Sequence, residues 1–226
     1  MRANGMKVLA FDTTLEACSA ALWQAGRVLA AEHRHIVRGH AEALLPMLER
    51  VRKKAGLDYG ELDLIAVTRG PGTFTGLRIG LAAARGLGLA SGRPVLGLTS
   101  LEALAAGAQP AANGQSLLVA IDARRGEVYG QAFDAQLMPL CQPFARSPAA
   151  AAEVLPEGPV LVLGSGAALI RECLAELPPG LRFSPGNEQP DAAVMAARAA
   201  ALAAAGELPQ RPPAPLYLRR PDARLP

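Results

Sequence analysis

The sequence predicts an α/β fold made of two copies of a β-β-β-α-β-α unit. Two apolar runs, Lys7–Asp12 and Leu117–Asp122, each end in an aspartate, and further strand-like segments follow each of them. Helical and strand-like segments then alternate in both halves, and residues 109–115, which contain Pro, Asn and Gly, separate the halves. Two units of the same order indicate an internal structural duplication.

The elements of the first half are set apart by turn-forming residues. Ala25-Gly26 lies between two strand-like segments, as in a hairpin, and Gly56 ends a segment whose apolar residues have helical spacing. Ser100 and Glu102 favour the start of another helix, because serine caps the first turn and an acid suits the helix dipole. We expect strands at 7–12, 18–24, 27–35, 62–68 and 94–99, and helices at 40–54, from the turn at 70–72 to 90, and at 101–108.

The second half repeats this order less regularly. We expect strands at 117–122, 127–134, 137–144 and 160–163, the third interrupted by prolines, and helices at 147–154, 167–177 and 191–205. The strand at 160–163 is closed by Gly164-Ser165-Gly166, a candidate turn for the adenosine side of a nucleotide site. The expected domains are 1–108 and 116–226, joined by a linker at 109–115, and the sequence leaves open whether the last helix packs on the first domain.

A glycine-rich segment joins a strand to a helix in the first half. Residues 68–80 read Thr-Arg-Gly-Pro-Gly-Thr-Phe-Thr-Gly-Leu-Arg-Ile-Gly. A turn of this kind can form a phosphate-sized nest of backbone N–H groups at a helix N-terminus. It is not a Walker loop, because no Gly-Lys-Ser/Thr follows, and its glycine spacing differs from the dinucleotide-binding fingerprint. The alternative is a tight turn that packs against a neighbouring segment.

Small residues recur at every fourth position of the same segment, at Gly72, Gly76, Gly80, Ala84 and Gly88. This spacing places them on one face of a helix. Because glycine weakens a helix interior by about 0.5–1 kcal/mol relative to alanine, we expect another backbone to approach this face closely. That backbone could belong to the same domain or to a partner chain.

Composition narrows the class of protein. Half of the residues are hydrophobic and the net charge is +3, which indicates a globular chain and is too small to predict nucleic-acid binding alone. Three separated cysteines and the absence of a signal-like or membrane-spanning segment predict a soluble, cytoplasmic protein. His33 and His35 share one face of a strand, where they are either candidate metal ligands or a solvated edge. No arrangement typical of a catalytic nucleophile is readable, so no catalytic residue and no metal site is predicted.

Duplicated units of this order define the actin-like fold, whose halves are ribonuclease-H-like. In that fold the matching acids, here Asp12 and Asp122, face each other across a cleft that holds a nucleotide and Mg²⁺. Arg124 and Arg125 stand where the phosphate loop of the second half is needed, which weakens the case for independent nucleotide binding. A vestigial nucleotide or phosphate site would comprise Asp12, Thr13, Gly70, Gly72, Thr73 and Asp122.

Four segments carry a closer resemblance. They are Val-Leu-Ala-Phe-Asp-Thr-Thr at 8–14, His-Ala-Glu-Ala-Leu-Leu-Pro at 40–46, the glycine-rich segment with its preceding valine at 67–80, and Val-Ala-Ile-Asp-Ala-Arg-Arg-Gly-Glu-Val-Tyr at 119–129. On these residues the sequence resembles the TsaB family, formerly called YeaZ. The resemblance spans most of the chain, and the closing Pro-Leu-Tyr-Leu-Arg at 215–219 is similar as well.

The resemblance implies a role in making threonylcarbamoyladenosine, the modified base beside the anticodon of tRNAs that read codons beginning with A. In this family the paralogue TsaD transfers the threonylcarbamoyl group, TsaE is an ATPase bound to the pair, and TsaB is a non-catalytic scaffold. No cofactor is therefore expected on this chain, ATP and metal are expected on the partner subunits, and tRNA is expected to be contacted through the complex. The metal-binding His-x-x-x-His of the catalytic paralogue has no counterpart at 100–105.

The resemblance and the small-residue face together predict an association surface. The surface would be formed by the helix expected at 40–54 and by the helix that follows the glycine-rich turn. We expect the corresponding two helices of TsaD to pack against it and, without TsaD, a second copy of this chain to form a homodimer. The alternatives are an actin-fold ATPase or kinase that acts alone through Asp12, Asp122 and the turn at 70–76, and a metallopeptidase with a tightly held metal. The residues expected in the association surface are Ala41, Leu44, Leu45, Leu48, Gly76, Gly80, Ala84 and Gly88.

Overall fold

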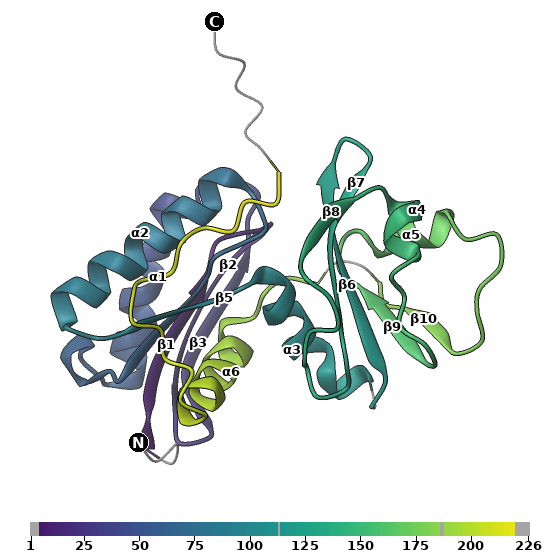
Figure 1. Cartoon of the computed structure of the whole chain (residues 1–226). Helices are drawn as coiled ribbons and strands as arrows, with labels where there is room; N and C mark the ends of the chain where they lie inside the picture. Colours follow the sequence, from purple (N-terminus) through teal and green to yellow (C-terminus); the bar gives the residue numbers. More distant parts are fainter. Residues whose placement is uncertain (1–4, 113, 186–187, 220–226) are drawn as a thin grey trace, which may run out of the picture. The chain divides into compact units, whose positions relative to one another are not determined.

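The structure is a computed structural model that describes residues 5–112, 114–185 and 188–219 (Figure 1). The chain divides into two compact units. Unit 1 comprises residues 1–107 and 189–215, and unit 2 comprises residues 108–188 and 216–226. Within the described residues, no helix has the length and apolar character that crossing a membrane requires.

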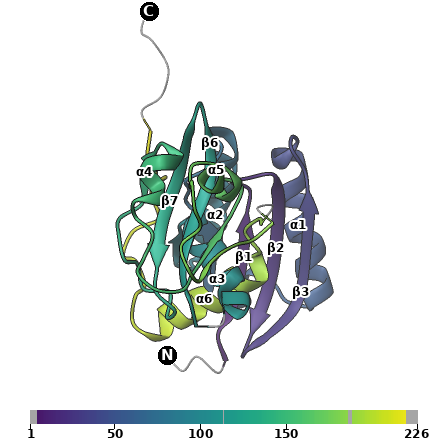
Figure 2. The ribbon, with the colours of Figure 1, turned by 90° about the vertical axis from the view of Figure 1, so that its right-hand side faces the viewer.

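Unit 1 contains a five-stranded sheet in the order β3-β2-β1-β4-β5. β1 and β3 pair antiparallel with β2, whereas β4 runs parallel to both β1 and β5. This order places β3 and β5 at opposite edges of the sheet, and Figure 2 shows β1, β2 and β3 side by side. The strands are β1 (Lys7–Asp12), β2 (Ala17–Gln24), β3 (Arg27–His35), β4 (Leu64–Thr68) and β5 (Val95–Leu98), and a short 3₁₀ turn, η2 (Tyr59–Glu61), precedes β4.

The alternation of side chains in β1 decides which helices cover each face of this sheet. Leu9 and Phe11 pack in one apolar cluster with α1 (His40–Ala55) and α2 (Phe74–Ser91). Val8 and Ala10 pack in another cluster with α6 (Ala192–Ala204), on the other face (Figure 1). Because β1 is buried on both faces, its sequence reads as a continuous apolar run.

Two features differ from the predicted domain boundaries. α6 packs on unit 1 through Met195, Ala196 and Ala199, so the predicted second domain, 116–226, is divided between the two units. α3 (Ser100–Ala112) continues to residue 112, so residues 109–112 of the predicted linker are helical. Alanines on both sides of Pro110 are strong helix formers, and the tertiary context of a helix can override the propensity cost of a single proline.

Unit 2 contains a second five-stranded sheet in the order β10-β9-β6-β7-β8. β7 pairs antiparallel with β6 and β8, and β9 runs parallel to β6 and β10, so the pattern of unit 1 is repeated. The predicted α/β fold of two duplicated units is therefore confirmed. The elements are β6 (Ser116–Arg124), β7 (Glu127–Phe133), β8 (Phe144–Arg146), α4 (Pro148–Ala152), β9 (Val160–Leu163), α5 (Ala167–Glu172) and β10 (Leu181–Phe183).

The predicted strand at 137–144 is wrong. Asp134 and Met138 close a turn, in which the Asp134 N–H donates to the Met138 carbonyl at 3.0 Å, and Leu137 adopts a positive φ of 64°. The strand β8 begins only at Phe144. α5 also ends five residues before the predicted boundary at 177, and the short β10 was not predicted.

Candidate functional site

The strongest candidate site in unit 1 is the carboxylate of Asp12, which ends β1 and is fully buried. Its Oδ1 accepts hydrogen bonds from the Thr14 hydroxyl at 2.6 Å, the Thr14 N–H at 3.1 Å and the Thr68 hydroxyl at 2.5 Å. Thr68 ends β4, the parallel neighbour of β1. The carboxylate therefore ties together the ends of two adjacent strands.

The hydrogen-bond network continues to the start of α3. The hydroxyls of Thr14 and Ser100 lie 3.0 Å apart, and since Thr14 donates its proton to Asp12, Ser100 donates to Thr14. The Ser100 N–H in turn donates to the Gly70 carbonyl at 2.9 Å. Asp12, Thr14 and Ser100 thus connect β1, the glycine-rich turn and α3 through buried polar groups.

Burial dominates the electrostatics of Asp12. It raises the pKa of the carboxyl above the ordinary value of 3.8, against the opposing effect of the hydrogen bonds from Thr14 and Thr68. The second oxygen, Oδ2, is buried without a hydrogen-bond partner. Mg²⁺ usually keeps several waters when it binds a carboxylate, so this arrangement, in which Asp12 has no solvent contact, suits an anchor for the turn better than a metal ligand.

The glycine-rich turn packs directly on the segment after β1. The Thr73 N–H, which an anion-binding nest would offer to phosphate, donates to the Thr14 carbonyl at 2.8 Å. A Cβ on Gly72 would lie 2.5 Å from the same carbonyl oxygen. Thr73 then caps α2 by accepting from the Gly76 N–H at 3.2 Å. The Thr73 N–H is therefore engaged by the chain's own backbone in this conformation, which favours the tight-turn interpretation.

The small-residue face of α2 also points into unit 1. A Cβ on Gly76 would overlap the Thr13 carbonyl oxygen, and a Cβ on Gly80 would lie 2.8 Å from the Thr13 hydroxyl. That hydroxyl donates to the Gly76 carbonyl at 2.7 Å. Ala84 is fully buried, and a Cβ on Gly88 would meet Val95 at 2.6 Å. The backbone that approaches this face closely is thus the turn after β1, within the same unit.

The predicted association surface consequently needs correction. Gly76, Gly80, Ala84 and Gly88 face the sheet and cannot contact a partner, and Leu44 and Leu48 are also buried, 1% and 0% exposed, in the core under α1. Of the eight residues, only Ala41 and Leu45 are exposed.

Sequence reasoning missed the residues that α2 presents outward. Leu89 is 88% and Phe74 48% exposed, and Ala82 and Gly86 lie on the same outward side. The signal was present in the sequence, because the large apolar residues Phe74 and Leu89 lie off the small-residue face, on the same outward side as Arg78 and Arg85.

Asp122 belongs to unit 2, whereas Asp12 belongs to unit 1. Its carboxylate accepts from the Arg124 N–H at 2.7 Å and pairs with the Arg124 guanidinium at 3.1 Å. The Asp122 N–H donates to the Ser165 hydroxyl at 3.0 Å, so the Gly-Ser-Gly turn is engaged by β6. Asp122 is therefore positioned by its own unit as a strand-end residue.

The turn between β6 and β7 has an unusual backbone. Arg124 and Arg125 both have positive φ values, 61° and 56°, a backbone conformation that residues other than glycine, asparagine and aspartate rarely adopt. Arg219 contacts this turn from the C-terminal segment: it pairs with Glu127 and donates to the carbonyls of Ala123, at 3.2 Å, and Arg124, at 3.3 Å. Three acceptors held by one guanidinium stabilise the turn.

His33 and His35 are exposed on the edge strand β3. Across the described residues, no group of His, Cys, Asp and Glu side chains is arranged to hold a metal ion.

Residues 34–159 match the family model described as TsaD, tRNA N6-adenosine threonylcarbamoyltransferase. The chain is 42% identical to the tRNA threonylcarbamoyladenosine biosynthesis protein TsaB of Escherichia coli, across 55% of this chain and 53% of that protein. It is 36% identical to an uncharacterized protein of Mycobacterium tuberculosis, across 96% of this chain and 93% of that protein.

Among solved structures, YeaZ from Pseudomonas aeruginosa superimposes with a TM-score of 0.84 and 32% identity, across 94% of this chain and 100% of that chain. In sequence the chain spans about half the length of the curated TsaB relatives that it matches. The family model matches residues 34–159, and the YeaZ structure matches 94% of the chain. The chain belongs to the TsaB family, formerly called YeaZ.

Proposed function

We propose that this chain is a non-catalytic scaffold subunit of the complex that transfers a threonylcarbamoyl group to tRNA. The modified base would be the adenosine beside the anticodon of tRNAs that read codons beginning with A. Support comes from relatives named as threonylcarbamoyladenosine biosynthesis proteins and from the match to the TsaD family model.

The single observation that carries the scaffold role is the exposure of large apolar side chains on α1 and α2. Leu89 is 88% exposed, Leu45 59% and Phe74 48%. α1 and α2 pack against one another, so their exposed apolar side chains can together contribute to an interaction surface. These side chains would supply the apolar area of a contact, while Ala82 and Gly86 would let a partner helix approach closely.

The partner that fits this surface is the TsaD paralogue, which would offer its corresponding pair of helices. In its absence a second copy of this chain would use the same surface in a symmetric homodimer. We further propose that TsaE binds the assembled pair in the cytoplasm, that tRNA is engaged in the complex, and that ATP and metal are held by the partner subunits.

The alternative, an actin-fold ATPase or kinase that acts alone, has less support. Asp12 is buried in a hydrogen-bond network, and the Thr14 carbonyl takes the Thr73 N–H that a phosphate would need. Nucleotide binding through this turn would require unit 1 to give up these contacts.

Size-exclusion chromatography with light scattering tests the scaffold role, on this chain alone and mixed with the paralogue from the same source. The informative variant is Leu45→Glu, and Met138→Glu is its matched control, because both side chains are 59% exposed and only Leu45 lies on α1. An unpaired carboxylate in an apolar contact should weaken association at least about tenfold.

Leu89→Glu should act in the same direction as Leu45→Glu, and Met138→Glu should leave association unchanged. Retained association in both α1 and α2 variants would contradict the proposed surface. A chain that is indifferent to the paralogue would contradict the scaffold role itself. Substitution of Gly80 is unsuitable here, because it would disturb the contact with Thr13 and report on folding.

A further inference from the structure

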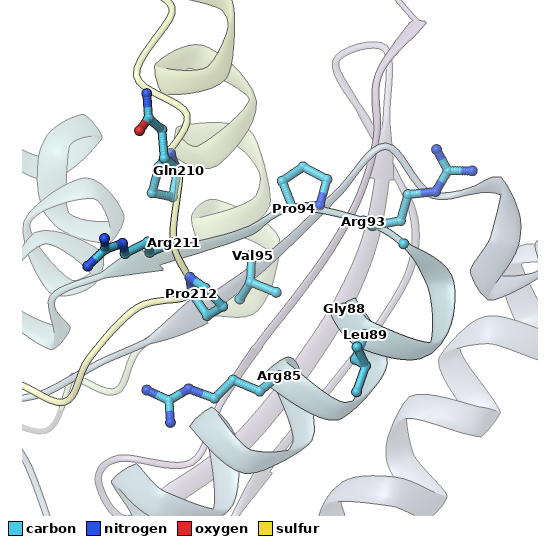
Figure 3. A pocket seen from close by; sticks show the side chains of 11 residues that line it. Arg85, Gly88, Leu89, Arg93, Pro94, Val95, Gln210, Arg211 and Pro212 are labelled. Carbon is cyan, nitrogen blue, oxygen red and sulfur yellow. The ribbon is translucent and has the colours of Figure 1, made fainter.

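A pocket of about 480 Å³ lies in unit 1 between the end of α2, the start of β5 and the C-terminal segment (Figure 3). Val95, Pro94 and Pro212 give it apolar walls, and Arg85, Arg93 and Arg211 are among the residues that line it. This volume lies within the range of small-ligand sites and exceeds what a lone phosphate needs. The pocket therefore offers both apolar and cationic surface.

The wall formed by the C-terminal segment is fixed in place. Pro213 packs on Gly97 of β5, where any Cβ would overlap the proline ring. The Arg85 guanidinium donates to the Pro213 carbonyl at 2.8 Å, which also orients the Arg85 side chain. The pocket is consequently built by contacts among β5, α2 and residues 209–213, and does not depend on a loose chain end.

The arginines of this pocket are not neutralised by carboxylates. No Asp or Glu lines the pocket, and none of the salt bridges among the described residues includes Arg85, Arg93 or Arg211. Arg85 and Arg93 donate instead to backbone carbonyls, and the Nε of Arg93 is buried without a partner. Arg50, by contrast, is paired with Glu32. The positive potential of the pocket is therefore available to an anion.

The directions of the side chains identify the direct contacts. Figure 3 shows the guanidinium groups of Arg85 and Arg211 extending to the same side of the C-terminal segment, with Pro212 between them, whereas Arg93 extends the other way. Guanidinium forks match phosphate oxygens bidentately, and the apolar walls suit the sugar or base attached to a phosphate. The chemistry of the pocket thus favours a phosphate that belongs to a nucleotide.

We propose that this pocket binds a backbone phosphate of the tRNA, with Arg85 and Arg211 as its contacts, an inference that rests on the function proposed above. A contact of this kind positions an RNA without reading its sequence. The scaffold subunit would then contact the tRNA substrate of the complex directly.

The test compares tRNA binding by the Arg85→Gln/Arg211→Gln variant with binding by Arg27→Gln/Arg34→Gln. Both variants remove two exposed positive charges, but Arg27 and Arg34 lie on β3, at the opposite edge of the sheet from the pocket. Fluorescence anisotropy of labelled tRNA is measured over a series of salt concentrations, with the chain alone and in complex with the TsaD paralogue. AMP and inorganic phosphate are added as competitors in separate titrations.

The pocket variant should bind tRNA about tenfold more weakly. The slope of its log affinity against log salt concentration should be smaller in magnitude by about 1–2. The β3 variant should retain both values. Equal affinities and slopes in the two variants would overturn the proposal, as would no tRNA binding by the unaltered chain in either state. A third outcome would also overturn the proposal: AMP binds the unaltered chain but not the pocket variant, while tRNA binding is the same in both. That result would assign the pocket to a free nucleotide.

Light scattering on the same samples separates this proposal from the scaffold role. The pocket variant should still associate with the paralogue, because Leu45, Phe74 and Leu89 are unchanged. Failure of the unaltered chain to associate would contradict the proposed function. Normal association with unchanged tRNA binding in the pocket variant would contradict the phosphate site alone.

Discussion

Replacing Gly76 by alanine tests how α2 is held on unit 1. The added Cβ would overlap the Thr13 carbonyl oxygen and lie 2.6 Å from the Thr73 hydroxyl that caps the helix. Thr13 is fully buried and its carbonyl oxygen is a backbone atom with little freedom to move, so the helix itself must shift outward. A shift would also lengthen the 2.7 Å hydrogen bond from the Thr13 hydroxyl to the Gly76 carbonyl.

The expected loss of stability follows from three contributions. Overpacking in a core typically costs about 1–3 kcal/mol, and the direct overlap with a carbonyl oxygen places this site at the upper end. The weakened hydrogen bond adds about 1 kcal/mol. Alanine in place of glycine in a helix returns about 0.5–1 kcal/mol. The net loss in the free energy of unfolding is therefore about 3 kcal/mol.

Gly86→Ala is the matched control, because it makes the same substitution on the same helix at an exposed position with no atom within 4 Å of the new Cβ. This variant should gain about 0.5–1 kcal/mol. Urea denaturation followed by the fluorescence of Trp23 measures both, since Trp23 is the single tryptophan and lies in the core of unit 1. With a typical urea dependence, the Gly76→Ala midpoint should fall by about 1 M.

The sign of the difference between the two variants is the decisive result. Equal changes at Gly76 and Gly86 would refute the inward orientation of the small-residue face. A stable Gly76→Ala chain that has lost association with the paralogue would show that this face contacts a partner, as the sequence alone first suggested.

Three further outcomes follow from the site geometry. Because burial raises the pKa of Asp12, its contribution to stability falls as the pH rises from 3.8 through the raised pKa of the folded state. The free energy of unfolding of Asp12→Asn, relative to that of the unaltered chain, should therefore increase over this pH interval and then level off, as measured by urea denaturation at a series of pH values. Arg219→Ala should increase amide hydrogen exchange in residues 123–127, and Arg219→Lys should not restore protection, because an ammonium group cannot serve the three acceptors as the guanidinium fork does. Calorimetric titration of the isolated chain with Mg-ATP should show no micromolar binding, whereas binding that Asp12→Ala abolishes would support the ATPase alternative.

The elements of unit 1 could be predicted because their local signals agree with their tertiary roles. β1 is a continuous apolar run and is buried on both faces, and Gly56 ends α1 with a φ of 66°. Unit 2 was less predictable because its elements are short. β8 and β10 have three residues each, too few for a period-2 pattern, and their pairing with β7 and β9 depends on neighbours distant in sequence.

The candidate site shows the same division between what a pattern can and cannot specify. The position of Asp12 at a strand end was readable, but its burial depends on Thr68 and Ser100, which lie 56 and 88 residues further along the chain. A carboxylate at the end of a parallel strand can serve as a metal ligand or as an anchor. Neighbouring hydroxyls decide between these roles, and their placement is a property of the folded unit.

The orientation of α2 is the case in which the physical reason is clearest. Spacing establishes that Gly76, Gly80 and Gly88 share a face, and the helix cost of glycine establishes that something approaches that face closely. Neither fact identifies what approaches, because α2 also carries large apolar side chains on its outer side. Close backbone approach is most valuable where the neighbour is fixed in every molecule, as Thr13 is, since the cost of the glycines is then offset whether or not a partner is bound. The outer side, with Leu89 and Phe74, can be covered by partners that come and go, and there larger side chains give more apolar area per contact.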